Sequence, residues 1–281
     1  MKENNWDIII SSKHKFFNLN FTEILNYKDL ILMLVKRDFV TFYKQTILGP
    51  FWYLLQPLIT SLVFTLIFGR VAQLSTDGVP SFLFYMSGTV AWNFFATSLN
   101  ATSNTFLANS SIFSKVYFPR TVVPISIVIN CFFQFLIQFS IFLFFLIYYF
   151  YLGFDLNITY LFLLLPFIII QIALLGLGFG MLISSLTTKY RDLTFILTFG
   201  IQLWMFASPI VYPLSVIPEK YQILICLNPM TPIIETFKLC IFNNSSIGML
   251  QILIGVFLTF FILIFGFFMF NKMERSFVDT I

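Results

Sequence analysis

Uncharged polar residues recur at helical spacing inside otherwise apolar stretches of this chain. Asn93, Thr97 and Asn100 would share one face of a helix, and Asn104 continues that face. Two further stripes have the same character: Ser126, Asn130, Gln134 and Gln138, and Thr194, Thr198 and Gln202. Amides and hydroxyls suit a sugar polymer, which presents hydroxyls and needs no ionic partner. They equally suit hydrogen bonds that hold helices together, so both interpretations stay open.

Residue types for covalent chemistry, metal binding or nucleotide binding are sparse. The single His and the three Cys show no metal-ligand spacing, so we expect no metal centre and no cofactor. Cys226 and Cys240 could pair, but small apolar packing is the more ordinary role for them. The pattern GxxxxGK[ST] does not occur, so the chain has no phosphate loop with which to hold ATP. We therefore expect no enzyme activity from this chain.

The composition indicates that lipid is the solvent of this protein. Of the 281 residues, 59% are hydrophobic and 10% are charged, whereas about a quarter of a soluble domain is charged. The net charge of +4 predicts no nucleic-acid partner, because the basic residues flank the apolar stretches. A span needs roughly 20 apolar residues to cross about 30 Å of hydrocarbon. Six charge-free stretches reach that length: 48–69, 82–104, 121–151, 158–184, 193–212 and 248–270.

These stretches predict an all-α integral membrane protein with six transmembrane helices. We expect a cytoplasmic N-terminal part (1–47), a six-span domain (48–270) and a cytoplasmic tail (271–281). With both termini inside, only Arg70, Lys220 and Lys238 of the 16 Lys and Arg fall outside. Cytoplasmic loops of membrane proteins carry an excess of basic residues. The partition therefore predicts a multi-pass protein of the bacterial inner membrane with both termini cytoplasmic.

Two segments do not suit simple spans. Residues 27–44 would form an amphipathic helix on the inner leaflet, with Tyr27, Leu34 and Val35 on one side and Lys36 and Arg37 on the other. Asp38 interrupts the apolar side and is either paired within the complex or solvated at its edge. Residues 213–246 carry apolar runs too short to span. We expect two short re-entrant helices there, between spans five and six, broken at Asn228, Pro229 and Pro232.

Aromatic residues near span ends and a run of glycines within a span are further features that need interpretation. Trp52 and Tyr212 lie near span ends, where aromatic residues are ordinary membrane anchors, but aromatic faces also stack on sugar rings. The run Gly176, Gly178 and Gly180 lies within a span, where close helix packing is the better interpretation. The candidate substrate path consists of the following residues: Trp52, Asn93, Thr97, Asn100, Thr198, Gln202, Trp204 and Tyr212.

Several strings, in order along nearly the whole chain, resemble the ABC-2 family of polysaccharide and polyol-phosphate exporter permeases. That family moves O-antigen, capsule or teichoic acid precursors. The strings are KRDFVTFYKQTILGPFWYLLQP (36–57), NSSIFSKVYFPRTVVP (109–124), KYRDLTFIL (189–197), SPIVYP (208–213) and LNPMTPIIETFK (227–238). The resemblance implies a homodimer bound to two copies of a separate ATPase. The cargo it implies is a polysaccharide linked to undecaprenyl diphosphate in the membrane lipid.

The resemblance also implies residue roles. Coupling to the ATPase would involve Ile112, Phe113, Lys115, Phe118, Arg120, Tyr190, Arg191 and Asp192. We expect Ile112 and Phe113 to be exposed on the permease itself, where they would insert either into an ATPase groove or into the inner leaflet as an anchor. Lys36, Arg37 and Lys44 would attract the lipid diphosphate. Asn228, Pro229 and Glu235 would belong to an outer gate. Two alternatives are an ABC-2 permease for a drug or small lipid and a membrane-embedded glycosyl transferase. The transferase would need clustered outer carboxylates, which the sequence does not provide.

Overall fold

The computed structural model describes residues 21–45, 51–113, 115–116, 118–155, 160–190, 192–245 and 247–278, and this part of the chain is helical without any strand. The α-helices are α1 (Phe21–Asn26), α2 (Lys28–Gln45), α3 (Phe51–Phe64), α4 (Ser81–Ser103), α5 (Thr105–Ala108), α6 (Ser110–Phe113), α7 (Val122–Tyr151), α8 (Leu165–Thr187), α9 (Leu193–Phe206), α10 (Glu219–Ile225), α11 (Met230–Phe242) and α12 (Met249–Val278). A π-helical segment, Thr65–Val71, continues α3. Short 3-10 turns occupy Tyr160–Leu164 and Leu214–Val216.

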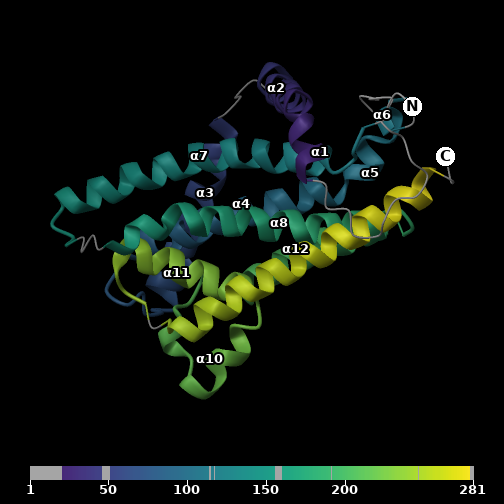
Figure 1. Ribbon diagram of the computed structural model, residues 1–281. Helices are drawn as coiled ribbons and strands as arrows, with labels where there is room; N and C mark the ends of the chain where they lie inside the picture. The colour runs from purple at the N-terminus through teal and green to yellow at the C-terminus, as the bar shows by residue number, and fades with distance from the viewer. Residues whose placement is uncertain are drawn as a thin grey trace, which may run out of the picture.

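The centre of the bundle is formed by α4 and α8, which lie side by side with α7 and α12 flanking them (Figure 1). Most residues of α4 are buried, including Phe94, Phe95 and Leu99. Apolar side chains of α7, α8 and α11 join them in one continuous core. Because α4 is covered by other helices, most of its polar residues are sheltered from lipid.

Four helices are long and apolar enough to cross a membrane: Phe51–Val71, Val122–Tyr151, Tyr160–Thr187 and Met249–Glu274. They coincide with the first, third, fourth and sixth expected spans. The second expected span is present as α4, but α4 does not reach the hydropathy of the other four. The physical reason is its central position, since a helix surrounded by protein needs no continuous apolar surface. A six-span topology thus stays a prediction.

The fifth expected span is shorter than the sequence suggested. Helix α9 has 14 residues, which corresponds to about 21 Å at 1.5 Å per residue. It ends at Phe206 and not at Tyr212, because Pro209 and Pro213 follow and proline cannot continue a helix. At the other end of the chain, α12 runs on to Val278, through most of the segment expected to be a tail.

The expected pair of short helices is present as α10 and α11, which are bent by 111° at the break between them. The break includes Asn228 and Pro229, as predicted, but Pro232 does not contribute to it. Pro232 lies in the first turn of α11, where a missing backbone N–H costs no helical hydrogen bond. Whether the pair re-enters the membrane stays a prediction.

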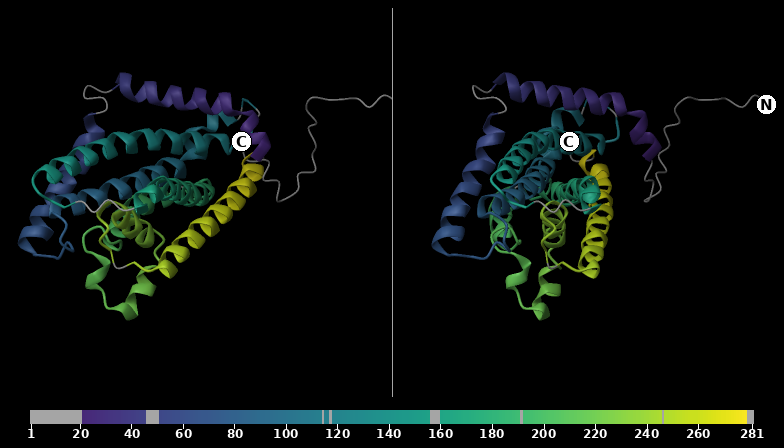
Figure 2. Two further views of the ribbon diagram at one scale, coloured as in Figure 1. Left: turned by 60° about the vertical axis from the view of Figure 1, so that its left-hand side comes forward. Right: turned by 90° about the vertical axis from the view of Figure 1, so that its left-hand side faces the viewer.

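Helix α2 lies across the outside of α7 (Figure 2). Its inward side buries Leu34 and Val35, while Lys36 and Arg37 are exposed on its other side. Phe39 is partly exposed and contacts Phe133 of α7 edge-on, with 6.0 Å between the ring centroids. The helix is therefore attached to the bundle by one apolar side, and its basic side stays free for other contacts.

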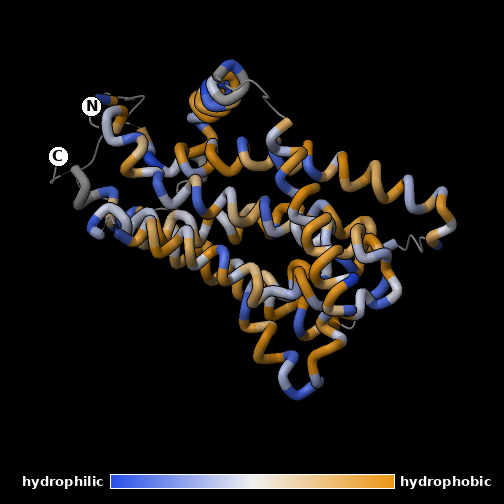
Figure 3. The backbone as a smooth tube through the Cα atoms, turned by 180° about the vertical axis from the view of Figure 1, so that it is seen from behind, coloured by the Kyte–Doolittle hydropathy of each residue, from blue (hydrophilic) through white to orange (hydrophobic). Residues whose placement is uncertain are grey.

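The long helices consist largely of hydrophobic residues, as the hydropathy colouring shows (Figure 3), and many large apolar side chains among them are exposed. Phe144, Phe167 and Phe257 are examples from three different helices, and all three are exposed. Water would disfavour such a surface, whereas lipid does not. The fold is consequently that of a multi-pass membrane protein.

Helix α8 makes its closest contacts at the glycine run. A Cβ atom on Gly176 would lie 2.7 Å from the Cβ of Ser98 in α4. A Cβ on Gly178 would lie 2.8 Å from the Cα of Leu263 in α12. Small residues allow helix backbones to approach in this way, so the predicted role in close packing is confirmed.

Segments that the topology assigns to the same side lie together in space. At one end, the Asp77 carboxylate accepts hydrogen bonds from the Ser215 hydroxyl at 2.8 and 2.9 Å, and Asn244 donates to the Asp77 carbonyl. At the other end, the Arg120 guanidinium donates to the Glu274 carbonyl at 3.0 Å. The chain therefore passes back and forth between two ends of one bundle.

Candidate functional site

Two of the predicted polar stripes lie on the central helix α4 and on α7, which flanks it. Asn93 and Thr97 are half-buried and Asn100 is exposed, while Gln138 on α7 is buried. The Thr97 hydroxyl donates to the carbonyl of Asn93 at 2.7 Å, within its own helix. The stripe residues thus do not form a continuous interhelical hydrogen-bond ladder among the described residues.

Several amide groups in these stripes keep unused hydrogen-bonding capacity. The Nδ2 atoms of Asn93 and Asn130 and the Oε1 atom of Gln138 are buried, and none has a hydrogen-bond partner among the described residues. Buried polar groups are usually paired, because an unpaired one loses its interaction with water. These three atoms therefore represent buried hydrogen-bonding capacity that the described part of the chain does not use.

The stripe on α9 is separate from the others. Thr198 and Gln202 are exposed in the single chain, and α9 buries none of its residues completely. Asn100 of α4 and Trp52 of α3 are exposed as well. Half of the predicted path residues therefore lie on the surface of the single chain and do not line an internal channel.

Trp204 is held by an aromatic cluster. Its ring contacts Phe179 at 5.0 Å and Phe95 at 5.2 Å between centroids, and Trp92 lies at 6.2 Å. Its indole Nε1 donates to the Asn228 side-chain oxygen at 2.8 Å. The structure thus joins Trp204, predicted in the path, to a residue predicted in the outer gate.

Asn228 connects the break between α10 and α11 to the end of α9. Its amide nitrogen donates to the Ser208 hydroxyl at 3.0 Å, and its oxygen also accepts from the backbone N–H of Met230 at 3.1 Å. The neighbouring Pro229 is buried. Tyr212 is half-buried against the core in the connection after α9. The residues predicted for the outer gate are therefore firmly positioned.

The most buried charges described in this chain are in α11. Lys238 and Glu235 are only 2% and 3% exposed, and Lys238 Nζ lies 3.5 Å from Glu235 Oε1. Lys238 also donates to the Pro209 carbonyl at 2.5 Å and lies 3.7 Å from the centroid of the Phe84 ring. The Ser245 hydroxyl donates to Glu235 Oε2 at 2.8 Å. These contacts tie α11 to α4 and to the segment after α9.

Lys238 was not among the predicted site residues. In the sequence it counted as one of three outside basic residues and as the basic residue that ends the string LNPMTPIIETFK. Its position three residues after Glu235 was the available signal, since residues at that spacing are neighbours on a helix. An ionisable pair within an apolar segment is by default a candidate for function.

The predicted coupling loop differs from expectation in one important respect. Phe113 is only 6% exposed, because it packs against Phe106 and Phe118 in a cluster that also contains Phe270 of the same chain. Arg120 is also buried, with its guanidinium carbon 5.3 Å from the centroid of the Phe113 ring. The expectation that Phe113 is exposed is therefore wrong. Residues of its own chain cover this side chain, which was expected to be covered by an ATPase groove.

Other residues of the predicted coupling surface are accessible. Lys115 is exposed, and so is its neighbour Val116, which was not among the predicted residues and is 58% accessible. In the loop before α9, Tyr190 and Asp192 are exposed too, whereas Arg191 lies outside the described residues. Ile112 is half-buried, in the last turn of α6. A coupling surface built from these residues stays a prediction.

The basic residues predicted to attract a diphosphate are exposed on α2. Lys36, Arg37 and Lys44 all reach the surface. The Arg37 Nε atom donates to Asp38 Oδ1 at 2.7 Å, so the carboxylate that interrupts the apolar side pairs within its own helix. Both side chains of this pair are partly exposed, and such pairs contribute only about 0 to 1 kcal/mol.

These features define a polytopic helical membrane protein with polar stripes, a buried ion pair and exposed loops at one end. The chain belongs to the ABC-2 type transporter family, whose profile matches residues 29–242.

Curated relatives extend the likeness to most of the chain. An O-antigen export system permease protein, RfbA, from Klebsiella pneumoniae is 29% identical over 254 residues, covering 90% of this chain and 95% of the relative. A second protein of that name and organism is 28% identical over the same coverage. A protein of that name from Myxococcus xanthus is 26% identical over 226 residues, covering 79% of this chain and 84% of the relative.

Proposed function

We propose that this chain is the permease subunit of an ABC transporter that exports a polysaccharide linked to undecaprenyl diphosphate, such as O-antigen, across the cytoplasmic membrane. The observation that carries the proposal is the likeness, along 79% to 90% of the chain, to permeases of O-antigen export systems. The polar stripes support it, because amides and hydroxyls suit a sugar polymer. Both termini would be cytoplasmic, with six spans between them.

The permease would work as a homodimer with its conduit between the two copies. Thr198, Gln202, Asn100 and Trp52 are exposed in the single chain, so a second copy would bring two sets of these side chains face to face. Helix α9 supports this arrangement, because its outer face is covered by no other part of the described chain. Asn228, Pro229 and Glu235 would form the outer gate of that conduit.

Transport would be driven by two copies of a separate ATPase. The exposed residues Lys115, Val116, Tyr190 and Asp192 would contact it. Movement at this surface would reach the spans through Arg120, which connects the loop to the end of α12. At the inner leaflet, Lys36, Arg37 and Lys44 would attract the diphosphate of the substrate.

A membrane-embedded transferase is less well supported. Of its candidate outer carboxylates, Asp77 accepts hydrogen bonds from Ser215. Glu235 is buried beside Lys238. Asp155 and Glu219 are exposed, but no three His, Cys, Asp or Glu side chains gather among the described residues, so a cluster for acid, base or metal roles is not assembled there.

Purification of the tagged chain from its native membrane should bring an ATPase with it, and the chain alone should not hydrolyse ATP. Val116→Asp should lose the ATPase without lowering the abundance of the permease, because a charge would be desolvated at the contact while the exposed position tolerates it. Val216→Asp is the matched control, since Val216 is 56% exposed in the segment after α9, at the other end of the bundle.

Two results would count against this proposal. Hydrolysis of ATP by the isolated chain would remove the need for a partner. Retention of the ATPase by Val116→Asp would place the contact elsewhere on the permease.

A further inference from the structure

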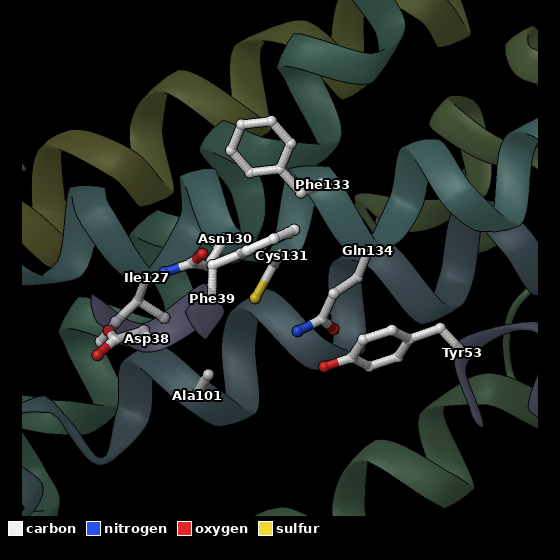
Figure 4. A pocket seen from close by; sticks show the side chains of 9 residues that line it. All are labelled: Asp38, Phe39, Tyr53, Ala101, Ile127, Asn130, Cys131, Phe133 and Gln134. Atoms are coloured by element: carbon white, nitrogen blue, oxygen red, sulfur yellow. The ribbon is translucent and has the colours of Figure 1, made fainter. Parts of the chain in front are cut away.

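A pocket of about 240 Å³ lies where α2 crosses α7, with α3 and α4 forming its remaining walls (Figure 4). It is open on one side. Pockets for drug-sized ligands are roughly 300 to 1,000 Å³. The volume therefore suits a single ring or a small head group and excludes a chain of several sugars.

Four polar side chains from three helices line this pocket. Asp38 contributes a carboxylate, Tyr53 a phenol, and Asn130 and Gln134 two amides. In Figure 4 the Gln134 amide and the Tyr53 hydroxyl point toward each other, while Asp38 lies on the opposite side of the pocket. Together these groups offer both donors and acceptors, with one negative charge and no positive charge.

Asn130 is the group whose surroundings point most clearly to a ligand. Its Nδ2 atom is buried and has no hydrogen-bond partner among the described residues. Buried polar groups are normally paired, and rotation of this amide toward the pocket would let an acceptor oxygen of the occupant restore the missing interaction. A hydroxyl group can accept this hydrogen bond and also donate to the Asp38 carboxylate.

The apolar part of the pocket combines two aromatic rings with Ala101, Ile127 and Cys131. Phe39 and Phe133 meet edge-on at 6.0 Å between centroids, with 70° between their planes. A sugar ring presents C–H groups on its faces and hydroxyls around its edge. An aromatic wall beside amides and a carboxylate matches both parts of such a ring, as binding pockets combine apolar walls with a few placed polar groups.

We propose that this pocket binds the sugar ring that is attached directly to the lipid diphosphate. The inference rests on the proposed function. Arg37 is the sequence neighbour of Asp38 and is exposed at the surface of α2, so a diphosphate at Arg37 would place its attached sugar beside the pocket. On binding, the weak surface pair between Arg37 and Asp38 would break. Arg37 would then contact the phosphate, and Asp38 would accept a hydrogen bond from a sugar hydroxyl.

Binding can be measured on the full-length permease in nanodiscs of dioleoyl phosphatidylcholine, with radiolabelled undecaprenyl diphosphate as probe. The probe would be used without a sugar, or carrying one N-acetylglucosamine or one galactose. A sugar-bearing probe should bind about tenfold more tightly than the sugar-free probe, equivalent to about 1.4 kcal/mol. Asn130→Leu should abolish this preference and leave binding of the sugar-free probe unchanged.

Asn271→Leu is the matched control, because Asn271 is a partly buried asparagine on α12, which does not line the pocket. It should keep the tenfold preference. Equal affinity of the wild-type protein for all three probes would overturn the inference, and so would equal loss of all three in Asn130→Leu. If phosphatidylethanolamine competes with the probes and the protein shows no preference for a sugar, the pocket binds a phospholipid head group instead. Failure of every undecaprenyl probe to bind would refute the proposed function as well.

Discussion

Lys238→Met should destabilise the purified permease by about 3 to 5 kcal/mol, the usual cost of removing one partner from a buried ion pair. The reason is the Glu235 carboxylate, which is 3% exposed and would remain buried with no cation beside it. The contact of Lys238 with the Pro209 carbonyl would be lost as well. The measurement is the midpoint of thermal unfolding in detergent, followed by size-exclusion chromatography of a fluorescent fusion.

The double variant Glu235→Gln with Lys238→Met provides the control. It removes both charges, and replacing a buried pair by neutral residues is often close to neutral for stability. The double variant should therefore melt well above Lys238→Met alone. If Lys238→Met melts like the wild type, or if adding Glu235→Gln does not raise the melting midpoint of Lys238→Met, the pair does not hold α11 in place.

Gly178→Val should prevent normal packing of α8 against α12. A Cβ at this position would lie 2.8 Å from the Cα and 2.9 Å from the N of Leu263, and backbone atoms cannot move aside as a side chain can. Overpacking of a core typically costs about 1 to 3 kcal/mol, and we expect at least the upper end here. The measurement is the yield of monodisperse protein extracted from membranes.

Gly200→Val is the control for this substitution. Gly200 also lies within a helix, but no atom stands within 4 Å of a Cβ placed there. Valine has the same modest effect on helix propensity at both sites, so a difference between them reports the contact with α12. Equal yields for the two variants would show that α8 and α12 do not pack as closely as described.

The sequence predicts the helical membrane class well, because hydropathy alone identifies a long helix that faces lipid. It is less informative for α4, whose polar residues are sheltered by neighbours that lie far away in the sequence. The sequence also overestimates the length of α9, since the charge-free stretch continues beyond the helix through Ser208 and Pro209. Charge-free length is thus a reliable signal only where the helix itself meets lipid.

Residue roles are harder to predict, because they depend on what covers each side chain. The pair Ile112 and Phe113 reads as exposed in a polar loop, but Phe113 packs against the nearby Phe106 in a cluster that also contains Phe270 of the distant helix α12. Trp204 and Asn228 were assigned to different functions, and only the fold brings them within hydrogen-bond distance. The basic residues of α2 were easier to place, since the period of the helix separates them from its buried side.

The most direct test of the proposed function is transport into inverted membrane vesicles that contain the permease and its ATPase. Lipid-linked polysaccharide would be supplied on the outward-facing cytoplasmic leaflet, and its protection from an added glycosidase would be followed over time. We predict protection that requires ATP, the permease and the ATPase together. No ATP-dependent protection, while the same vesicles accumulate a fluorescent drug or a short-chain lipid, would contradict polysaccharide export and favour the alternative cargo.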